Sequence, residues 1–545
     1  MSRVALSFIS VLPFILSCQS THEVDLLFYG GSIHIIENLS PDYTCLVVDD
    51  GKIIAYGSED SLRAIYHAKD ECNLAGKHVY PGWHDAHAHF ASTGKGLKEL
   101  QLKGVGSWQE CITIIQDYIA KNPDKDWIIG RGWDQNLWGG NYPDKSVLDS
   151  LFPAHHFYLS RVDGHAALVS GNILELLKYD GTTRLVGGDL LLNANGQLSG
   201  VLIDVAADEA KALLPELTYA EWREALREAQ KLFLSNGVVA VTEAGLPIDL
   251  ILLMDSMQKE GVLQMKFVTM LNPGEKEFDF AAKQGIYETP KLKIASFKLY
   301  ADGALGSRGA LLKAPYCDHS GIGLAVHNPA YFDSICEKIY ALGFQANTHC
   351  IGDSANRLIL ETYGKYLKGK NDLRWRIEHA QVIDRSDLHY FGDYSIIPSV
   401  QPTHATSDMP WAKDRLCAER MGGAYAYRSL LAEVGIMPLG TDAPVENINP
   451  IQTFISAVFR VNESGKPEGG FEISEALTRY HALLGMTAWP AKAGFTEHLY
   501  GSIKPGLAAD LVIYQEDLTR AGAKELFGIM PSSVWIDGKQ VGSND

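Results

Sequence analysis

The stretch PGWHDAHAHF, residues 81–90, places His84, His87 and His89 together with Asp85 behind a run of apolar residues. The apolar lead HVYPGW (78–83) indicates a buried strand that runs into this stretch. His87 and His89 are two positions apart, and residues with this spacing point to the same side of a strand. The stretch therefore predicts a strand whose polar end could hold one metal ion between two imidazoles. His84 is expected to be structural.

Seven further apolar segments predict strands, and helical segments separate most of them, such as 328–343. The expected strands are 238–245, 265–271, 293–303, 343–350, 374–380, 395–404 and 436–444. Strands that alternate with helices pair in parallel, and eight such units predict an α/β fold of the (β/α)8 TIM-barrel type. An open doubly wound sheet is the alternative, but no G-x-G-x-x-G loop follows the first strand.

The rest of the chain is divided around this barrel. Short strands with glycine turns are expected at both chain ends, and we predict that 18–80 and 495–545 form one composite β-sandwich domain. Residues 81–494 would form the barrel. The segment from about 91 to 237 is too long for one crossover, so we expect an insertion after the first barrel strand that covers the barrel mouth. Its last part, 219–237, predicts a helix that ends near Gly237.

The N-terminus indicates export. Arg3 precedes an apolar run from Val4 to Leu16, which is too short for a typical membrane span and resembles a signal peptide over 1–17. The sequence Ile15-Leu16-Ser17-Cys18 resembles a bacterial lipobox, so Cys18 is the predicted lipidation site. The expected location is the bacterial cell envelope, periplasmic or surface side, with membrane contact only through the lipid anchor. An ordinary cleaved signal and a poorly cleaved anchor are the alternatives.

Composition excludes some function classes. The chain has 545 residues with a formal net charge of -18, and it has no basic stretch, which argues against nucleic-acid binding. The eight cysteines are scattered without a C-x-x-C pair. This argues against a zinc ribbon or a dense disulfide framework, although an export compartment would permit a bridge. A homo-oligomer is compatible with the sequence, which does not indicate an oligomeric state.

Polar side chains recur where the expected strands end: Lys298, His349, His379 and Asp442 follow His87 and His89 in this pattern. The carboxyl ends of barrel strands share one face, where active sites form. Histidine nitrogens and carboxylate oxygens suit zinc and similar divalent ions. A lone histidine at a strand end is more often structural, so the ordered series carries the prediction.

This series resembles the amidohydrolase superfamily, and PGWHDAHAHF is similar to its first-strand signature. The segments GWDQNLW, RVDGHAA, KLYADGALGSRGA, THCIGDSAN, RIEHAQ, SVQPTH and GTDAPVENINP resemble the YtcJ-like, amidohydrolase-3 branch, which includes N-substituted formamide deformylases. The resemblance implies one or two divalent metal ions, with zinc expected. It places His87, His89 and Asp442 on one ion, His349 and His379 on the other, and a carbamylated Lys298 between them. The alternative is an unmodified Lys298 beside a single metal.

The resemblance also implies an activity, namely hydrolysis of a C–N bond in a small amide, formamide or N-acyl amine. Asp442 would act as general base and then as general acid. Lactone or ester hydrolysis and isomerisation are alternatives at the same metal site, and a non-catalytic envelope lipoprotein is an alternative of another class. Further polar residues could contact substrate, although a structural ion pair is an equal alternative for Asp302 and Arg308; the candidates are His165, Trp133, Asp302, Arg308 and His404.

Overall fold

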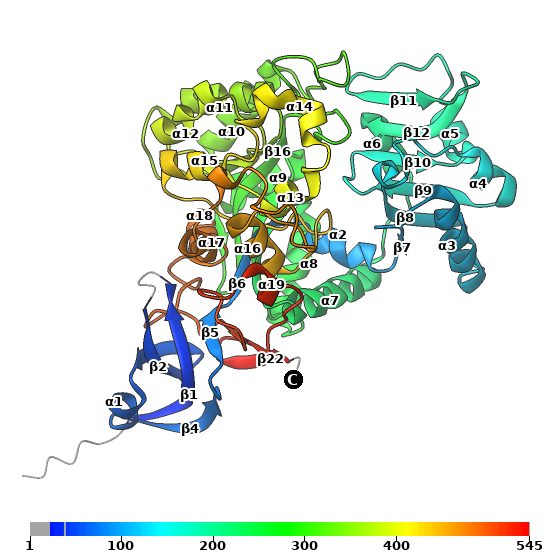
Figure 1. Ribbon diagram of the computed structural model, residues 1–545. Coiled ribbons are helices and arrows are strands. Elements are labelled where there is room, and N and C mark those ends of the chain that lie inside the picture. The colour runs from blue at the N-terminus through cyan, green and yellow to red at the C-terminus, as the bar shows by residue number, and fades with distance from the viewer. Residues whose placement is uncertain (1–21, 37–39, 544–545) are drawn as a thin grey trace, which may run out of the picture.

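The computed structural model describes residues 22–36 and 40–543. Its centre is a nearly closed barrel of seven parallel strands with helices around it (Figure 1). The strands run in chain order around the barrel: β6 (Trp83–Ala88), β13 (Val238–Leu246), β14 (Lys266–Leu271), β16 (Leu292–Tyr300), β17 (Gln345–Cys350), β18 (Arg376–His379) and β19 (Ile397–Ser399). The predicted parallel α/β barrel is therefore present.

The segment predicted as the eighth strand closes the gap without forming a regular strand. On one side, the N–H of Val400 donates to Pro438 and that of Gly440 donates to Val400. On the other side, the N–H of Ala86 donates to Leu439 at 3.2 Å. Regular pairing is interrupted because Pro438 has no N–H to donate and Asp442 has a left-handed φ of 57°.

The strand that carries the histidines begins later than its apolar lead indicates. Residues His78–Pro81 form β5, which belongs to another sheet, and β6 begins at Trp83. Gly82 makes this change of sheet possible, because a Cβ there would lie 2.5 Å from Cγ2 of Val239. The prediction that residues 78–81 belong to the barrel is therefore wrong. The barrel strand is β6, the segment that contains the histidines.

Both chain ends meet in one eight-stranded sheet beside the barrel, where Figure 1 shows blue N-terminal strands next to red C-terminal ones. Its order is β22-β21-β20-β5-β1-β2-β3, and β4 pairs with β1. The strands are β1 (His22–Ile35), β2 (Ser40–Asp49), β3 (Lys52–Gly57), β4 (Tyr66–Asn73), β5, β20 (Leu511–Tyr514), β21 (Ser533–Ile536) and β22 (Lys539–Ser543). Phe28 and Leu46 from the first set pack with Leu511 and Ile513 from the second.

The insertion has its own sheet and core, drawn in cyan in Figure 1. The sheet order is β11-β12-β10-β9-β8-β7. Its strands are β7 (Leu100–Gln101), β8 (Trp127–Trp133), β9 (His156–Arg161), β10 (Ala166–Val169), β11 (Gly188–Leu192) and β12 (Leu198–Asp204). The chain returns to the barrel through α7 (Tyr219–Ser235), which begins with a capping box of Thr218 and Glu221. Gly237 follows with a φ of 84°, so the predicted helix is confirmed.

Helices follow the barrel strands and surround the sheet. The main ones are α2 (Phe90–Gly96), α8 (Ile248–Lys259), α9 (Glu275–Gln284), α10 (Pro329–Ala341), α11 (Asp353–Leu367), α12 (His389–Tyr394), α13 (Pro402–Asp408), α14 (Ala412–Met421), α15 (Tyr427–Val434), α16 (Pro450–Val458), α17 (Arg479–Gly485) and α18 (Ala488–Ala493). A disulfide between Cys317 and Cys417 joins the loop after β16 to α14. In the described part of the chain, every helix is too short or too polar to cross a bilayer. The expected signal segment 1–17 and Cys18 lie outside the described residues.

Candidate active site

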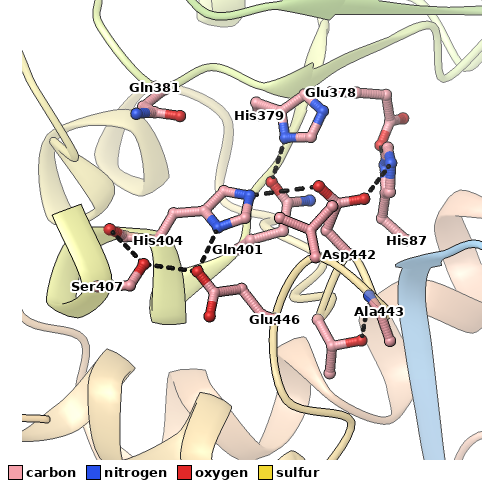
Figure 2. Close-up of polar contacts among 12 residues, drawn as sticks. His87, Glu378, His379, Gln381, Gln401, His404, Ser407, Asp442, Ala443 and Glu446 are labelled. Atoms are coloured by element: carbon pink, nitrogen blue, oxygen red, sulfur yellow. Dashed lines mark hydrogen bonds and ion pairs between the residues drawn. The ribbon is translucent and has the colours of Figure 1, made fainter. Parts of the chain in front are cut away.

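The imidazoles of His87 and His89 lie close to the carboxylate of Asp442, which is more than 350 residues later in the chain. Figure 2 shows the contact between His87 and Asp442. The Nε2 atoms of His87 and His89 lie 3.5 and 3.3 Å from Oδ1 of Asp442. His87 is on β6, whereas His89 precedes α2 as its N-cap residue. Each of the three residues offers an atom within 4.8 Å of the others, which is the spacing of ligands that share an ion.

A second group shares the same carboxylate. His379 at the end of β18 and His404 on α13 each offer an atom within 4.8 Å of the other and of Asp442. Oδ2 of Asp442 lies 3.4 Å from Nε2 of His404. His404 is thus placed among candidate ligands, although its sequence position indicated only substrate contact.

Lys298 and His349 lie inside the same cluster. Nζ of Lys298 is 3.3 Å from Nε2 of His87, and the rings of His349 and His379 are 4.5 Å apart between centroids. Lys298 is fully buried and His349 is nearly so. The structure therefore brings together all six residues that the strand-end pattern selected: His87, His89, Lys298, His349, His379 and Asp442.

Hydrogen bonds fix the orientation of the imidazoles. Nδ1 of His87 contacts Oε2 of Glu378, and Nδ1 of His379 lies 2.7 Å from Oε1 of Gln401. Nδ1 of His404 lies 3.1 Å from Oε1 of Glu446. Such partners select one tautomer and leave Nε2 directed at the centre of the cluster.

Sequence reasoning missed these three partners, although each lies within five residues of a selected one. Glu378 directly precedes His379 in RIEH, and Gln401 opens the segment QPTH. Glu446 follows Asp442 in GTDAPVE. Their nearness to the selected residues was the available signal, but a carboxylate or amide near a strand end has many other structural uses.

The carboxylate of Asp85 connects the two backbone segments that carry His87 and Asp442. Oδ1 of Asp85 accepts from the backbone N–H groups of His87 and Thr441, at 3.1 and 3.0 Å. Its Oδ2 accepts from Oγ1 of Thr441 at 2.5 Å. The close approach of these two segments requires glycine at position 440, because a Cβ there would lie 2.5 Å from the backbone nitrogen of His87.

Burial determines the charges in the cluster. It lowers the pKa of Lys298 to about 8 and that of His87 to about 4. Burial opposes ionisation of Asp442, yet the contacts with His404 and His89 hold its pKa well below the usual range. Burial also lowers the pKa of His349 and of His379 well below the usual range. His87, His349 and His379 are thus neutral imidazoles beside an ionised carboxylate, the protonation states in which these side chains coordinate a metal. Burial opposes the charged form of His404, but its contacts with Asp442 and Glu446 raise its pKa to about 10.

Unpaired buried atoms also fit a metal. Nε2 of His349 and Oδ1 of Asp442 are buried and make no regular hydrogen bond to any described residue. Their ionic neighbours are Asp302, 3.7 Å from His349, and the imidazoles of His87 and His89, 3.5 and 3.3 Å from Asp442. A buried polar atom without a hydrogen bond costs free energy, and a bound cation would satisfy both atoms. The residues present therefore fit one or two divalent ions, with ligands drawn from His87, His89, Lys298, His349, His379 and Asp442, and with His404 beside them.

A cavity of about 270 Å³ opens onto the cluster and is lined by the barrel and the insertion. The insertion contributes the polar side chains of Lys103, Asp134, Asn136, Arg161, Asp163 and His165. Nδ1 of His165 lies 2.9 Å from Oδ1 of Asp204. Burial opposes the charged form of His165, but Asp204 and the neighbouring carboxylates raise its pKa to about 9. His165 therefore presents a cation to the cavity near neutral pH.

Three of the predicted substrate-binding residues are absent from the described lining of this cavity. Trp133 lies in the core of the insertion, where its Nε1 donates to Leu159 at 2.6 Å. Asp302 is buried and accepts backbone N–H groups from Leu311, Ile351 and Gly352. Arg308 pairs with Asp318 at 2.8 Å. The geometry thus gives Trp133, Asp302 and Arg308 structural contacts in place of the expected substrate contacts.

Comparisons with known proteins agree with this architecture. The chain is 31% identical to "Protein LONG AFTER FAR-RED 3" of Arabidopsis thaliana over 95% of this chain and 91% of that protein. It is 29% identical to "Putative amidohydrolase YtcJ" of Bacillus subtilis, strain 168, over 90% of this chain and 94% of that one. A crystal structure of an uncharacterized metal-dependent hydrolase from Pyrococcus horikoshii OT3 superposes with a TM-score of 0.75 at 26% identity, covering 92% of this chain and 99% of the other. Residues 70–542 match the Amidohydrolase family, to which this chain belongs.

Proposed function

We propose that this protein is a metal-dependent hydrolase that cleaves a C–N bond in a small amide, formamide or N-acyl amine. The observation that carries the proposal is the convergence of two groups of candidate ligands on Asp442, which lines the cavity. Family membership supports hydrolysis. The resemblance to N-substituted formamide deformylases, one of which is 23% identical to this chain, supports the C–N bond. A cavity of about 270 Å³ suits a small molecule.

The metal we propose is zinc. Divalent ions of this kind supply water activation at neutral pH and polarisation of a carbonyl group. His87, His89, His349, His379 and Asp442 would hold one or two of them. Lys298 would complete the site as a carbamate, and its lowered pKa of about 8 supports this because a neutral amine is the form that takes up carbon dioxide.

The protein groups have separate tasks in the reaction. Asp442 would accept the proton of the attacking water and then deliver it to the leaving amine. Glu378, Gln401 and Glu446 would keep His87, His379 and His404 in orientation. His165, charged near neutral pH, would donate a hydrogen bond to an acceptor on the substrate.

A hydrolysis screen tests the proposal. Zinc-reconstituted protein is assayed against formamides, N-acyl amino acids and lactones, with Asp442→Asn as the matched control. We expect turnover of a formamide or N-acyl compound and a loss of about 10²–10⁴-fold in kcat for Asp442→Asn, the size of a general acid–base contribution. Unchanged turnover in this variant would remove Asp442 from the mechanism.

Elemental analysis provides a check that does not depend on substrate. We expect one or two divalent ions per chain in the cluster. A protein without stoichiometric metal after zinc reconstitution would contradict the metalloenzyme proposal. Turnover of lactones alone would instead favour ester hydrolysis at the same site.

We also propose that the protein is exported and anchored in the bacterial envelope through a lipidated Cys18. The Cys317–Cys417 disulfide supports an oxidising compartment. Metabolic labelling with palmitate in a bacterial host tests the anchor. Label is expected in the wild type and not in Cys18→Ala; equal labelling of the two would contradict it.

A further inference from the structure

A second cluster of metal-ligating side chains lies in the sheet that joins the two chain ends. It consists of His34 on β1, His78 on β5 and Asp517, which follows β20. Each residue offers a ligand atom within 4.8 Å of the others. None of the three lines the active-site cavity. The cluster therefore has no part in the proposed hydrolysis.

The two imidazoles face each other at a distance suited to a shared ion. Nε2 of His34 lies 2.9 Å from Nδ1 of His78. Two nitrogens that each lie about 2.0–2.1 Å from one ion are about 2.9–3.4 Å apart when the angle between them is about 90–110°. The observed separation is at the lower end of this range, so both nitrogens could coordinate one ion without a change of backbone.

The carboxylate is oriented by bonds to one of its two oxygens. Oδ1 of Asp517 accepts from the N–H and the hydroxyl of Thr519, at 2.9 and 2.6 Å, and from the hydroxyl of Tyr80 at 3.2 Å. Oδ2 has one described ionic neighbour, Nε of Arg520, at 3.5 Å. The Arg520 side chain is 76% exposed and can turn into solvent. Oδ2 is thus the oxygen left for a cation, with its partner oxygen held as metal-ligating carboxylates are.

Packing fixes the first imidazole as well. The ring of His34 stacks on that of Tyr80 with centroids 4.4 Å apart and planes 3° from parallel. His34 is also buried, so neighbouring side chains hold its ring in place. Because the ring is already held in place, less conformational entropy is lost when an ion binds.

We propose that His34, His78 and Asp517 bind a divalent transition-metal ion, such as zinc or nickel, that ties the two chain ends together. Two imidazoles and one carboxylate suit these ions. The three ligands come from three segments: β1 and β5 from the N-terminal side, and the turn after β20 from the C-terminal side. His78 is paired across the sheet with both neighbours, Ser32 and Tyr514. An ion at this point binds only the assembled sheet, so it stabilises the folded chain.

Metal content of the full-length protein tests the site. The wild type, His34→Gln and His78→Gln are equilibrated with zinc at a buffered micromolar free concentration, and zinc per chain is measured by elemental analysis. The wild type should retain one ion per chain more than either variant. Zinc should also raise the Tm of the wild type by several degrees more than that of the variants, while the hydrolytic activity of the zinc-loaded proteins stays equal.

The matched control is His498→Gln. His498 also lies beside a carboxylate, 3.1 Å from Glu288, and forms no described metal-ligating group. This variant should bind as much zinc as the wild type. Equal zinc content and an equal zinc-dependent Tm shift in the wild type and His78→Gln would overturn the proposal and leave a plain hydrogen bond between the two histidines. His78 is only half-buried, so its variant decides the question even if His34→Gln fails to fold.

Discussion

His87 and Asp442 are joined both by backbone and by side chain. The N–H of Asp442 donates to the carbonyl oxygen of His87 at 2.7 Å, and Nε2 of His87 lies 3.5 Å from Oδ1 of Asp442. The same contact closes the barrel and places a candidate ligand beside the candidate general base. Stability of the barrel seam and geometry of the site therefore depend on the same atoms.

Gly440→Ala tests this dependence. The added Cβ would lie 2.5 Å from the backbone nitrogen of His87, so the seam must open. We expect a loss of about 1–3 kcal/mol in the free energy of unfolding, typical of overpacking, together with weaker zinc binding. Denaturant unfolding and zinc titration measure both. Gly106→Ala, whose Cβ would come no closer than 3.8 Å to its nearest neighbour, is the control. Wild-type values for Gly440→Ala would disprove the coupling.

Gln401→Leu tests the hydrogen bond that orients His379. The variant removes the acceptor that lies 2.7 Å from Nδ1 of His379. Loss of such a partner should weaken zinc affinity by about 10–100-fold. Competition with a chelator measures the affinity. Gln401→Glu keeps an oxygen acceptor and should restore most of it, and an unaltered affinity in Gln401→Leu would show that His379 needs no such partner.

His165 predicts a pH dependence of stability. Its pKa in the folded chain, about 9, is above its ordinary value of about 6.5 because of Asp204. The contribution of a group with a raised pKa is fully present below the unfolded value and is lost as the pH rises through the folded value. The free energy of unfolding should therefore fall between about pH 6.5 and 9. His165→Gln should show a smaller fall in chemical denaturation at a series of pH values. Equal pH profiles would contradict the assignment.

Lys266 forms a buried ion pair that connects β14 to the chain-end sheet. Its Nζ lies 2.5 Å from Asp510 and 2.9 Å from Asp537, and Lys266 and Asp510 are both buried. Lys266→Met should cost about 3–5 kcal/mol in the free energy of unfolding because it leaves a buried carboxylate unpaired.

A second substitution distinguishes the charge from packing. Lys266→Met with Asp510→Leu should recover part of the loss, because neither charge then remains buried alone. The exposed pair Lys283–Asp279 provides the control, and Lys283→Met should change stability by less than about 1 kcal/mol. No recovery in the double variant would mean that packing dominates at this position.

The Cys317–Cys417 bridge should stabilise the chain measurably. The two cysteines are 100 residues apart, and closing a loop of this length in the unfolded chain contributes up to about 4–5 kcal/mol. Cys317→Ser should therefore lower the Tm under oxidising conditions, whereas a reducing agent should lower only the Tm of the wild type. Cys336→Ser, at a buried free cysteine, separates bridging from packing. Insensitivity of the wild type to the reducing agent would contradict a stabilising bridge.

The strand-end residues could be recognised from sequence because the pattern repeats. His87, Lys298, His349, His379 and Asp442 each end a short apolar segment, and parallel barrel strands end on one face. Glu378 and Gln401 could not be recognised in this way. Each makes a hydrogen bond to an imidazole from another barrel segment. Nearness to a selected residue is their only local signal, and it does not distinguish them from ordinary polar residues.

The hydrophobic pattern also could not predict which sheet a strand joins. β5 and β6 are both buried, and a buried apolar run has the same pattern whichever sheet it joins. Trp133 and Asp302 show the same limit, because a polar or aromatic residue near a predicted site can as well anchor the backbone of a loop. The direction of the side chain decides whether such a residue contacts substrate or anchors a loop. Hydrophobic periodicity gives no information about this direction.

The sequence by itself determined the parallel barrel and the candidate ligands at its strand ends, because alternation of apolar strands with helices and the chemistry of the strand ends are local properties. Only the tertiary structure decided that Asp442 is shared by two ligand groups, that the insertion supplies His165 to the cavity, and that His34, His78 and Asp517 meet. Those relations join segments far apart in the chain, and packing of the whole molecule fixes their distances.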